Sequence, residues 1–400
     1  MVYNKKQNQT GNPQIKRRDR FMWITNAEVL CDDFTFRKAD LEIEGTQIKT
    51  IDTTCSHTAD KEGGLDAKGQ KVIPGLLDIH THGCDGVDTC DGNIEGYHKM
   101  AKYYADNGIT SYLATTMSID AKEIDKICTM VHEFSQKGHD GAYLHGIYME
   151  GPFFSKQKCG AQDPKYIINP DIELFRKINA DCGGFIKTVA IAPELDGAME
   201  FIDALKDEVL ITIAHTMSDY DTAVKAMKKG VHHVTHLFNA MPAFTHREPG
   251  VVGAIFEDDD ATAELICDGI HIHPAVIRTV FKTLGYDRVC LISDSMCAAG
   301  LPDGKYHLGG QEVFVKEGAA RLANGALAGS STNLFRCMRN VHSFGIPLEM
   351  AVKAASLNPA RAIGVDNVTG SIKEGKHADL VVLDEQLNPA HVFVRGNQVK

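Results

Sequence analysis

Residues 72–83 have the sequence Val72-Ile73-Pro74-Gly75-Leu76-Leu77-Asp78-Ile79-His80-Thr81-His82-Gly83, an apolar run that ends in two histidines separated by one residue. Successive side chains of a β-strand point to opposite faces, so His80 and His82 should face the same way at the end of the run. Pro74-Gly75 and Gly83 interrupt the chain on either side, which places the pair where a buried strand opens into a loop. Two histidines on one face are half of a metal site, and a hydrogen-bonded pair in the core has the same pattern.

The composition is that of a globular protein with a large core. The 400 residues are 43% apolar and 24% charged, enough for one barrel-sized domain and a smaller one. We find no run of about 18 apolar residues and no apolar core of a secretory signal, so we expect a cytoplasmic protein without a membrane partner. Residues 1–20 are polar and basic, which predicts a disordered tail.

The formal net charge of −11 disfavours a nucleic-acid partner, because the field of the whole molecule repels polyanions. A small anionic ligand would therefore need a local basic pocket. The eleven cysteines contain no Cys-x-x-Cys pair. Without a secretory signal they are expected to be buried thiols in a reducing cytoplasm, and a disulfide framework is not expected.

Apolar, strand-like runs alternate with helical patterns after Pro74. The eight runs are Leu76–His80, Ile109–Thr115, Ala142–Met149, Phe185–Ala192, Val209–His215, His232–Leu237, Ala263–Cys267 and Val289–Ser293. Each run is followed by enough residues for a crossover helix, as in 218–229, where Ser218 is the expected N-cap and Gly230 the stop. Eight such units predict a (β/α)8 TIM-type barrel, although length alone also fits an open doubly wound sheet.

The two ends of the chain have a different, β-rich pattern. Three short alternating segments lie within residues 21–73, and further β segments follow at 370–384 and 391–394. We therefore predict a small β-sandwich domain built from 21–73 and 366–400, and a barrel domain over 74–365. Between them, residues 295–325 form a glycine-containing excursion, and helices are predicted at 332–344 and at 348–355, the latter closed by Asn358-Pro359.

Residues with metal-binding side chains recur at the ends of the predicted strands. They are His80, His82, Glu150, His215, His236 and Asp294. The C-terminal face of the strands is where barrel enzymes assemble their active sites, which favours the barrel over the open sheet. Each residue alone has an ordinary structural explanation, but six together are hard to explain in that way. Imidazoles and carboxylates in this ratio suit zinc, iron or manganese, and disfavour calcium.

The same stretches resemble a known enzyme family. Residues 74–83 are similar to the opening of the amidohydrolase superfamily. Within it, this chain resembles the N-acetylglucosamine-6-phosphate deacetylase family in six stretches: Met149–Phe153, Ala214–Thr216, Thr235–Met241, His246–Gly250, Asp268–His271 and Ser293–Met296. The resemblance covers roughly residues 21–400.

The resemblance implies a metal-dependent deacetylase that forms glucosamine 6-phosphate and acetate. It implies that Glu150, His215 and His236 hold one divalent ion, zinc or iron, and that His80 and His82 can hold a second, with Asp294 alongside as the catalytic acid and base. One position departs from the family pattern. Where some members have a histidine that polarises the substrate carbonyl, this chain has Gln162, which donates a hydrogen bond but carries no proton.

The resemblance also implies a phosphate site and a dimer. The phosphate would be bound by Arg247, by His271 and by the backbone amides of Asn239 and Ala240. In the family the arginine reaches the site of a neighbouring subunit, so a homodimer is expected. The alternative explanation of Arg247 is a surface ion pair with Glu248.

Two other functions are compatible with parts of the pattern. A dihydroorotase or dihydropyrimidinase relative would need a carboxylated lysine at the end of the fourth strand, and Lys187 lies early in that run. A barrel that has lost catalysis and serves in assembly would be expected to have lost ligands, and all six are present.

Overall fold

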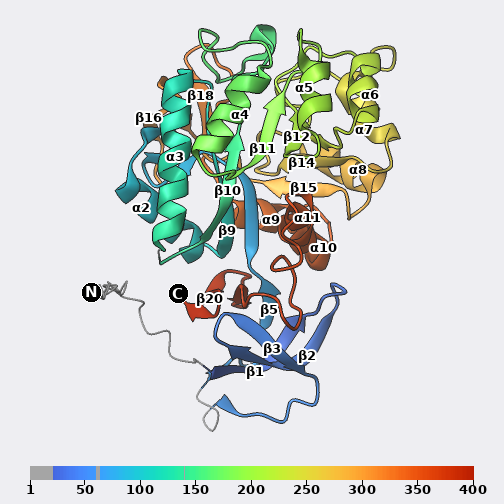
Figure 1. The fold of residues 1–400 in the computed structure, drawn as a ribbon. Helices are drawn as coiled ribbons and strands as arrows, with labels where there is room; N and C mark the ends of the chain where they lie inside the picture. The colour runs from blue at the N-terminus through green and yellow to red at the C-terminus, as the bar shows by residue number, and fades with distance from the viewer. Residues whose placement is uncertain (1–20, 60–63, 139) are drawn as a thin grey trace, which may run out of the picture.

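The computed structural model of this protein describes residues 21–59, 64–138 and 140–400. The tail predicted for residues 1–20 lies outside them. The described chain forms a barrel surrounded by helices, with a smaller β domain at one end that contains both the first and the last strands (Figure 1).

The barrel sheet contains the eight predicted strands in chain order. They are β6 (Leu76–Thr81), β9 (Ile109–Thr115), β10 (Tyr143–Met149), β11 (Ile186–Ile191), β12 (Leu210–Ile213), β13 (His233–Val234), β14 (Thr262–Ile266) and β15 (Val289–Ile292). All neighbours along this order are parallel. The first and last strands meet through a parallel bridge between Thr81 and Ser295, and the Asp294 amide donates to the His80 carbonyl at 3.0 Å. The predicted TIM-type fold is therefore confirmed.

Each barrel strand is followed by a helix, as the alternating pattern predicts. The helices are α2 (Ile94–Asp106), α3 (Ala121–Lys137), α4 (Ile172–Asp181), α5 (Ala198–Leu205), α6 (Tyr220–Lys228), α7 (Gly250–Glu257), α8 (Pro274–Leu284) and α9 (Leu334–Ser343). Their apolar faces and the strands share one large buried cluster, in which Phe175 and Phe201 of two helices join Val189 of a strand. The N-cap of α6 is Asp219 and not the predicted Ser218, because the Asp219 carboxylate accepts the Thr222 amide at 2.8 Å.

The smaller domain is one mixed sheet made from both ends of the chain, as predicted. Its hydrogen-bonded order is β21 (Asn397–Gln398), β20 (Pro389–Val394), β19 (Leu380–Leu383), β5 (Lys71–Pro74), β1 (Phe21–Leu30), β2 (Phe36–Glu44) and β3 (Gln47–Asp52), with β4 (Leu65–Asp66) beside β1. The sheet curls back on itself, because the Ile48 amide donates to Lys376 O and the Ala378 amide to Thr46 O. It encloses its own apolar core. In Figure 1, β5 leads from this domain directly up into the barrel.

Two features between β15 and β19 were not predicted. The excursion at 295–325 contains an antiparallel sheet of β16 (Gly304–Leu308), β17 (Gln311–Lys316) and β18 (Ala319–Leu322). The helix at α10 (Leu348–Ala355) ends before Asn358-Pro359, which lie in a further short helix, α11 (Leu357–Ala362). The Asn358 side chain donates to the carbonyls of Tyr286 and Val289 and so attaches α11 to the start of β15. Among the described residues, no helix combines the length and apolar character needed to cross a bilayer.

Candidate active site

The structure brings the six strand-end residues together at the C-terminal mouth of the barrel. Five of them form two groups, in each of which one donor atom per residue lies within 4.8 Å of the others. The groups are His80, His82 and Glu150, and Glu150, His215 and His236. All five are buried. Glu150 is common to both groups.

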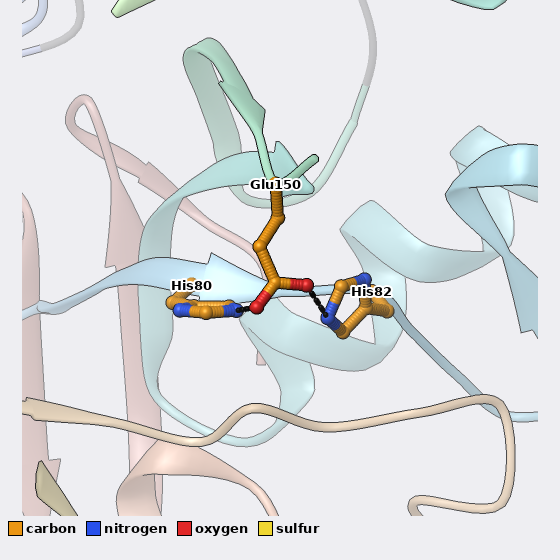
Figure 2. Close-up of side chains that lie close together, drawn as sticks. All are labelled: His80, His82 and Glu150. Atoms are coloured by element: carbon orange, nitrogen blue, oxygen red, sulfur yellow. Dashed lines mark ion pairs between the residues drawn. The ribbon is translucent and has the colours of Figure 1, made fainter. Parts of the chain in front are cut away.

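Glu150 lies between His80, which is in β6, and His82, which follows the last residue of β6. Figure 2 shows its carboxylate pointing down between the rings, with one oxygen toward each. Its Oε1 atom is 3.5 Å from His80 Nε2, and its Oε2 atom is 3.4 Å from His82 Nε2. This confirms that the two histidines face the same way, as expected from the period of a strand.

The second group approaches the same carboxylate from the other side. The Nε2 atoms of His215 and His236 each lie 3.2 Å from Glu150 Oε1, and 3.2 Å from one another. The His215 Nδ1 atom lies 2.9 Å from the Lys158 carbonyl, so Nδ1 carries the proton and Nε2 presents its lone pair to the cluster. The His215 Nε2 atom and the carboxylate oxygen beside it are then both acceptors, which is unfavourable unless a positive charge lies between them.

The donor set therefore fits a divalent cation. His80 is fully buried, and among the described residues its Nε2 atom has no hydrogen-bond partner. An unpaired imidazole nitrogen facing a carboxylate is costly, and coordination would remove that cost. Imidazoles with a carboxylate suit zinc and other first-row transition metals. The buried cluster is consistent with one or two divalent metal sites.

The ionisation of these groups shows how strongly they interact. Burial would raise the pKa of Glu150, but interactions with the imidazoles of His215, His236 and His82 hold it well below its usual value. Burial would lower the pKa of His80, yet the negative charges of Glu264 and its neighbours raise it to about 9. The excess of negative charge in the cluster thus attracts either protons or a metal cation.

Asp294 lies between the histidine pair and the open cavity. Its Oδ1 atom is 3.4 Å from His82 Nε2 and 3.8 Å from His80 Nε2. Burial opposes its ionisation, but the hydrogen bond with His82 and the charge of His80 lower its pKa, so it is a carboxylate at neutral pH.

Three of the six residues have left-handed backbone conformations. The φ angles are 44° at His215, 29° at His236 and 47° at Asp294. Such angles cost a side-chain-bearing residue about 1 to 3 kcal/mol and are concentrated at functional sites. Here they occur where each strand ends and its loop begins. Sequence patterns give no sign of these angles, because none of the three is glycine.

Gln162, the position that departs from the family pattern, lies against Glu150. Its Nε2 atom donates to Glu150 Oε2 at 2.6 Å and lies 3.6 Å from Met117 Sδ, while its Oε1 atom accepts the Ser118 amide at 2.6 Å. The side chain is buried, so the amide fixes the orientation of the glutamate. A glycine at position 151 lets Ser118 lie this close to Glu150 and Gln162, because a Cβ atom at Gly151 would be 2.1 Å from Ser118 Oγ.

A cavity of about 440 Å³ opens onto the cluster, within the usual range for small-molecule sites. Of the cluster, His82, Glu150, His215 and His236 line its wall. Five more of the predicted residues line it as well: Gln162, Asn239, Ala240, His271 and Asp294. His271 is held by Asp268, whose Oδ2 atom lies 2.7 Å from His271 Nδ1. The Asn239 amide already donates to the His236 carbonyl, whereas the Ala240 amide has no partner among the described residues.

Arg247 does not line this cavity and is exposed in the loop after β13. Among the described residues, the lining has one arginine and no lysine. That arginine is Arg321 on β18, a residue that the sequence patterns did not identify. Its Nη1 atom donates to the carbonyl of Gly325, which also lines the wall. Lys187 lies at the start of β11, away from the strand ends, as predicted.

Comparison with known proteins agrees with this geometry. The model of the amidohydrolase family matches residues 71–399. N-acetylglucosamine-6-phosphate deacetylase of Bacillus subtilis (strain 168) is 39% identical over 331 residues, which are 82% of this chain and 84% of that protein. N-acetylgalactosamine-6-phosphate deacetylase of Escherichia coli O157:H7 is 37% identical over 327 residues, with 81% and 86% covered.

A solved structure is similar over nearly the whole chain. It is a point mutant of N-acetyl-D-glucosamine-6-phosphate deacetylase from Mycobacterium smegmatis in complex with N-acetyl-D-glucosamine-6-phosphate. The TM-score is 0.88 at 31% identity, and the match covers 95% of this chain and 99% of that one. The chain therefore belongs to the amidohydrolase family and, within it, to the N-acetylglucosamine-6-phosphate deacetylases.

Proposed function

We propose that this protein hydrolyses the acetamide of N-acetylglucosamine 6-phosphate to glucosamine 6-phosphate and acetate. The observation that carries the proposal is the buried cluster around Glu150, which opens onto a cavity of small-molecule size. The relatives named above act, by their names, on 6-phosphates of N-acetylated hexosamines. All eleven cysteines are free thiols, which supports a reducing, cytoplasmic location for the reaction.

The cofactor in this proposal is zinc or iron. Glu150, His215 and His236 would hold one ion, and His80 with His82 would hold a second beside Asp294. Both sets include or adjoin the Glu150 carboxylate, whose two oxygens face all four histidines. A bound divalent cation supplies Lewis acidity and lowers the pKa of water at the site.

Asp294 is the catalytic acid and base in this mechanism. Its carboxylate lies at the cavity edge of the cluster, where it can accept a proton from the attacking water. The protonated Asp294 then donates that proton to the amine as the bond between carbon and nitrogen breaks. Because the same side chain serves both steps, its position between the histidines and the cavity is essential.

The phosphate of the substrate would be bound by other groups of the cavity wall. The Ala240 amide, the His271 side chain and the Arg321 guanidinium offer donors or positive charge there. Among the described residues, Arg321 is the one arginine of the cavity wall and forms no ion pair with a carboxylate. Asn239 is less suited to the phosphate, because its backbone amide donates to the His236 carbonyl and its Nδ2 atom donates to the carbonyls of His236 and Leu237. Its Oδ1 atom would instead accept from a hydroxyl of the sugar.

The direct test is acetate release from N-acetylglucosamine 6-phosphate by the metal-loaded protein. We expect kcat/KM for this substrate to exceed that for unphosphorylated N-acetylglucosamine by about 100-fold or more, because the phosphate contacts are lost in the latter. N-acetylgalactosamine 6-phosphate is the comparison substrate, since one relative acts on it. Faster turnover of that epimer would correct the substrate, and no turnover of either would refute the proposal.

The proposed assembly is a homodimer in which Arg247 reaches the partner's cavity. An apolar groove of about 510 Å³ adjoins the active-site cavity, and Phe238 and His271 line both. Phe244, three residues before Arg247, lines the groove with 51% of its surface exposed. A second copy of the chain covering this apolar surface would bring its own Arg247 loop close to the cavity.

Mixing two inactive variants tests whether Arg247 acts across subunits. In a mixed dimer of Asp294→Asn with Arg247→Ala, the subunit that retains Asp294 would receive an intact Arg247 from its partner. Random reassociation should restore about a quarter of the parental sites, since half the dimers are mixed and each has one complete site. No recovery, despite mixed dimers demonstrated by differential tagging, would refute action across subunits.

A further inference from the structure

A carboxylate outside the six strand-end residues lies behind the histidine cluster. Glu264 occurs in the middle of β14 and is fully buried. Its Oε2 atom lies 2.9 Å from His80 Nδ1 and accepts the His236 backbone amide at 3.3 Å, and its Oε1 atom lies 3.2 Å from His233 Nε2. A single side chain therefore contacts one residue of each metal-binding group.

The contact with His80 determines which nitrogen faces the cluster. Since a carboxylate can only accept, Nδ1 of His80 must carry a proton, and Nε2 is left to face Glu150. A carboxylate behind an imidazole also increases the basicity of the opposite nitrogen. The other three histidines lack such support: Nδ1 of His215 faces a carbonyl, and Nδ1 of His82 and of His236 has no partner among the described residues.

The contact with His236 links the two groups. His236 has a strained backbone, with φ at 29°, and its amide is held by the same oxygen that holds His80. The Leu237 amide also donates to the backbone carbonyl of Glu264 at 2.9 Å. The position of Glu264 therefore fixes both the end of β13 and the ring of His80.

We propose that Glu264 is a positioning residue for metal binding: it holds His80 with Nε2 toward the cation and strengthens that nitrogen as a ligand. This inference rests on the proposed metal site. An alternative explanation for the same bonds is a purely structural network in the core of the barrel, in which His233 and Thr262 take part through a 2.6 Å contact. The two explanations differ in what a substitution changes.

The experiment measures two stepwise zinc dissociation constants by competition with a chromophoric chelator, starting from metal-free protein. In Glu264→Leu, which removes both acceptor oxygens, we expect the constant of the histidine-pair site to rise about 100-fold, the upper end for carboxylates behind a liganding histidine. In Glu264→Gln, which keeps one acceptor oxygen, we expect about 10-fold. The constant that disappears in the double variant His80→Asn/His82→Asn identifies the pair site.

The matched control is Thr262→Val, which removes the hydroxyl that contacts His233 and leaves the bond between Glu264 and His80 in place. It should lower the melting temperature of the metal-free protein while both zinc constants remain within about twofold of the parent. Parental constants in both Glu264 variants, or equal weakening in Thr262→Val, would overturn the proposal. Binding of only one zinc ion by the parent would overturn it too.

These outcomes are separate from those of the proposed function. If the parent binds two zinc ions and the Glu264 variants lose one, but no acetate is released from either sugar phosphate, the deacetylase assignment fails and the role of Glu264 stands. If acetate is released and the Glu264 variants keep parental constants, the assignment stands and the role of Glu264 fails.

Discussion

Replacing Asp294 by asparagine separates proton transfer from metal binding. The change retains shape and one acceptor oxygen, and it removes the ability to take up a proton. Asparagine is among the residues that tolerate left-handed angles, so φ of 47° at this position should be kept. The backbone is further held by the bond from the Asp294 amide to His80 O at 3.0 Å and from the Ser330 amide to Asp294 O at 2.7 Å.

The expected loss is in kcat. A positioned general acid or base typically contributes about 10² to 10⁴ in rate, or about 3 to 5.5 kcal/mol of the barrier. Asp294 is 8% exposed and lies 3.4 Å from His82 Nε2, which leaves little room for a bulk water molecule to replace it as the base. We therefore expect a loss near the upper end of this range, with KM for the sugar phosphate changed less than threefold.

The assay is steady-state acetate release, with metal content measured on the same sample. Asp268→Asn is a suitable control, since Asp268 is also an acid with a buried side chain beyond a strand end, but it contacts His271 and not the metal cluster. It should raise KM more than it lowers kcat. If Asp294→Asn retained kcat within about tenfold of the parent at full metal content, Asp294 would not be the acid and base.

Three further changes test other parts of the site and fold. Glu150→Ala should abolish both metal binding and activity, because its oxygens face all four histidines, and full metal content by elemental analysis would contradict that. His80→Asn/His82→Asn should lose one ion and about 100-fold or more in kcat, with KM nearly unchanged; two ions retained would contradict the two-site assignment. Burial and the charge of Arg395 lower the pKa of His145 from 6.5 to about 3, so the unfolded chain takes up a proton that the folded chain does not, and stability falls as the pH drops from 6.5 toward 3. His145→Gln should reduce that slope by up to about 1.4 kcal/mol per pH unit, measured by urea unfolding, and an unchanged slope would refute the assignment.

The barrel and its strand ends could be predicted because both depend on local patterns. Parallel strands buried on both faces are short apolar runs, and a ligand at a strand end interrupts such a run at its last residue. His215 follows β12 in this way, and Asp294 follows β15. Because the ends of the strands share one face of the barrel, their order along the chain was enough to predict that they meet.

Other parts depend on contacts that the local pattern does not contain. Glu264 lies inside an apolar run, where a single charge looks like an irregularity, and its significance appears only when His80 is found 2.9 Å away on a strand distant in sequence. Arg321 belongs to the three-stranded sheet formed within residues 295–325. The pairing of these strands depends on their neighbours and not on the β-propensity of their residues. The place of Arg321 on the cavity wall follows from how that sheet folds over the barrel mouth.

The departure at Gln162 and the retention of His80 and His82 can be understood together. Both hydrogens of the Gln162 amide point to Glu150 and Met117, and its oxygen already accepts the Ser118 amide. Turning this side chain toward a substrate carbonyl would break a 2.6 Å charge-assisted bond and release the carboxylate on which both metal groups depend, at a cost of about 1.5 to 3 kcal/mol. Gln162 is therefore better suited to holding Glu150 than to polarising the acetamide. The electrophile that the mechanism needs must then come from the cation side of the cavity, where Glu264 holds His80 in the orientation required for a ligand.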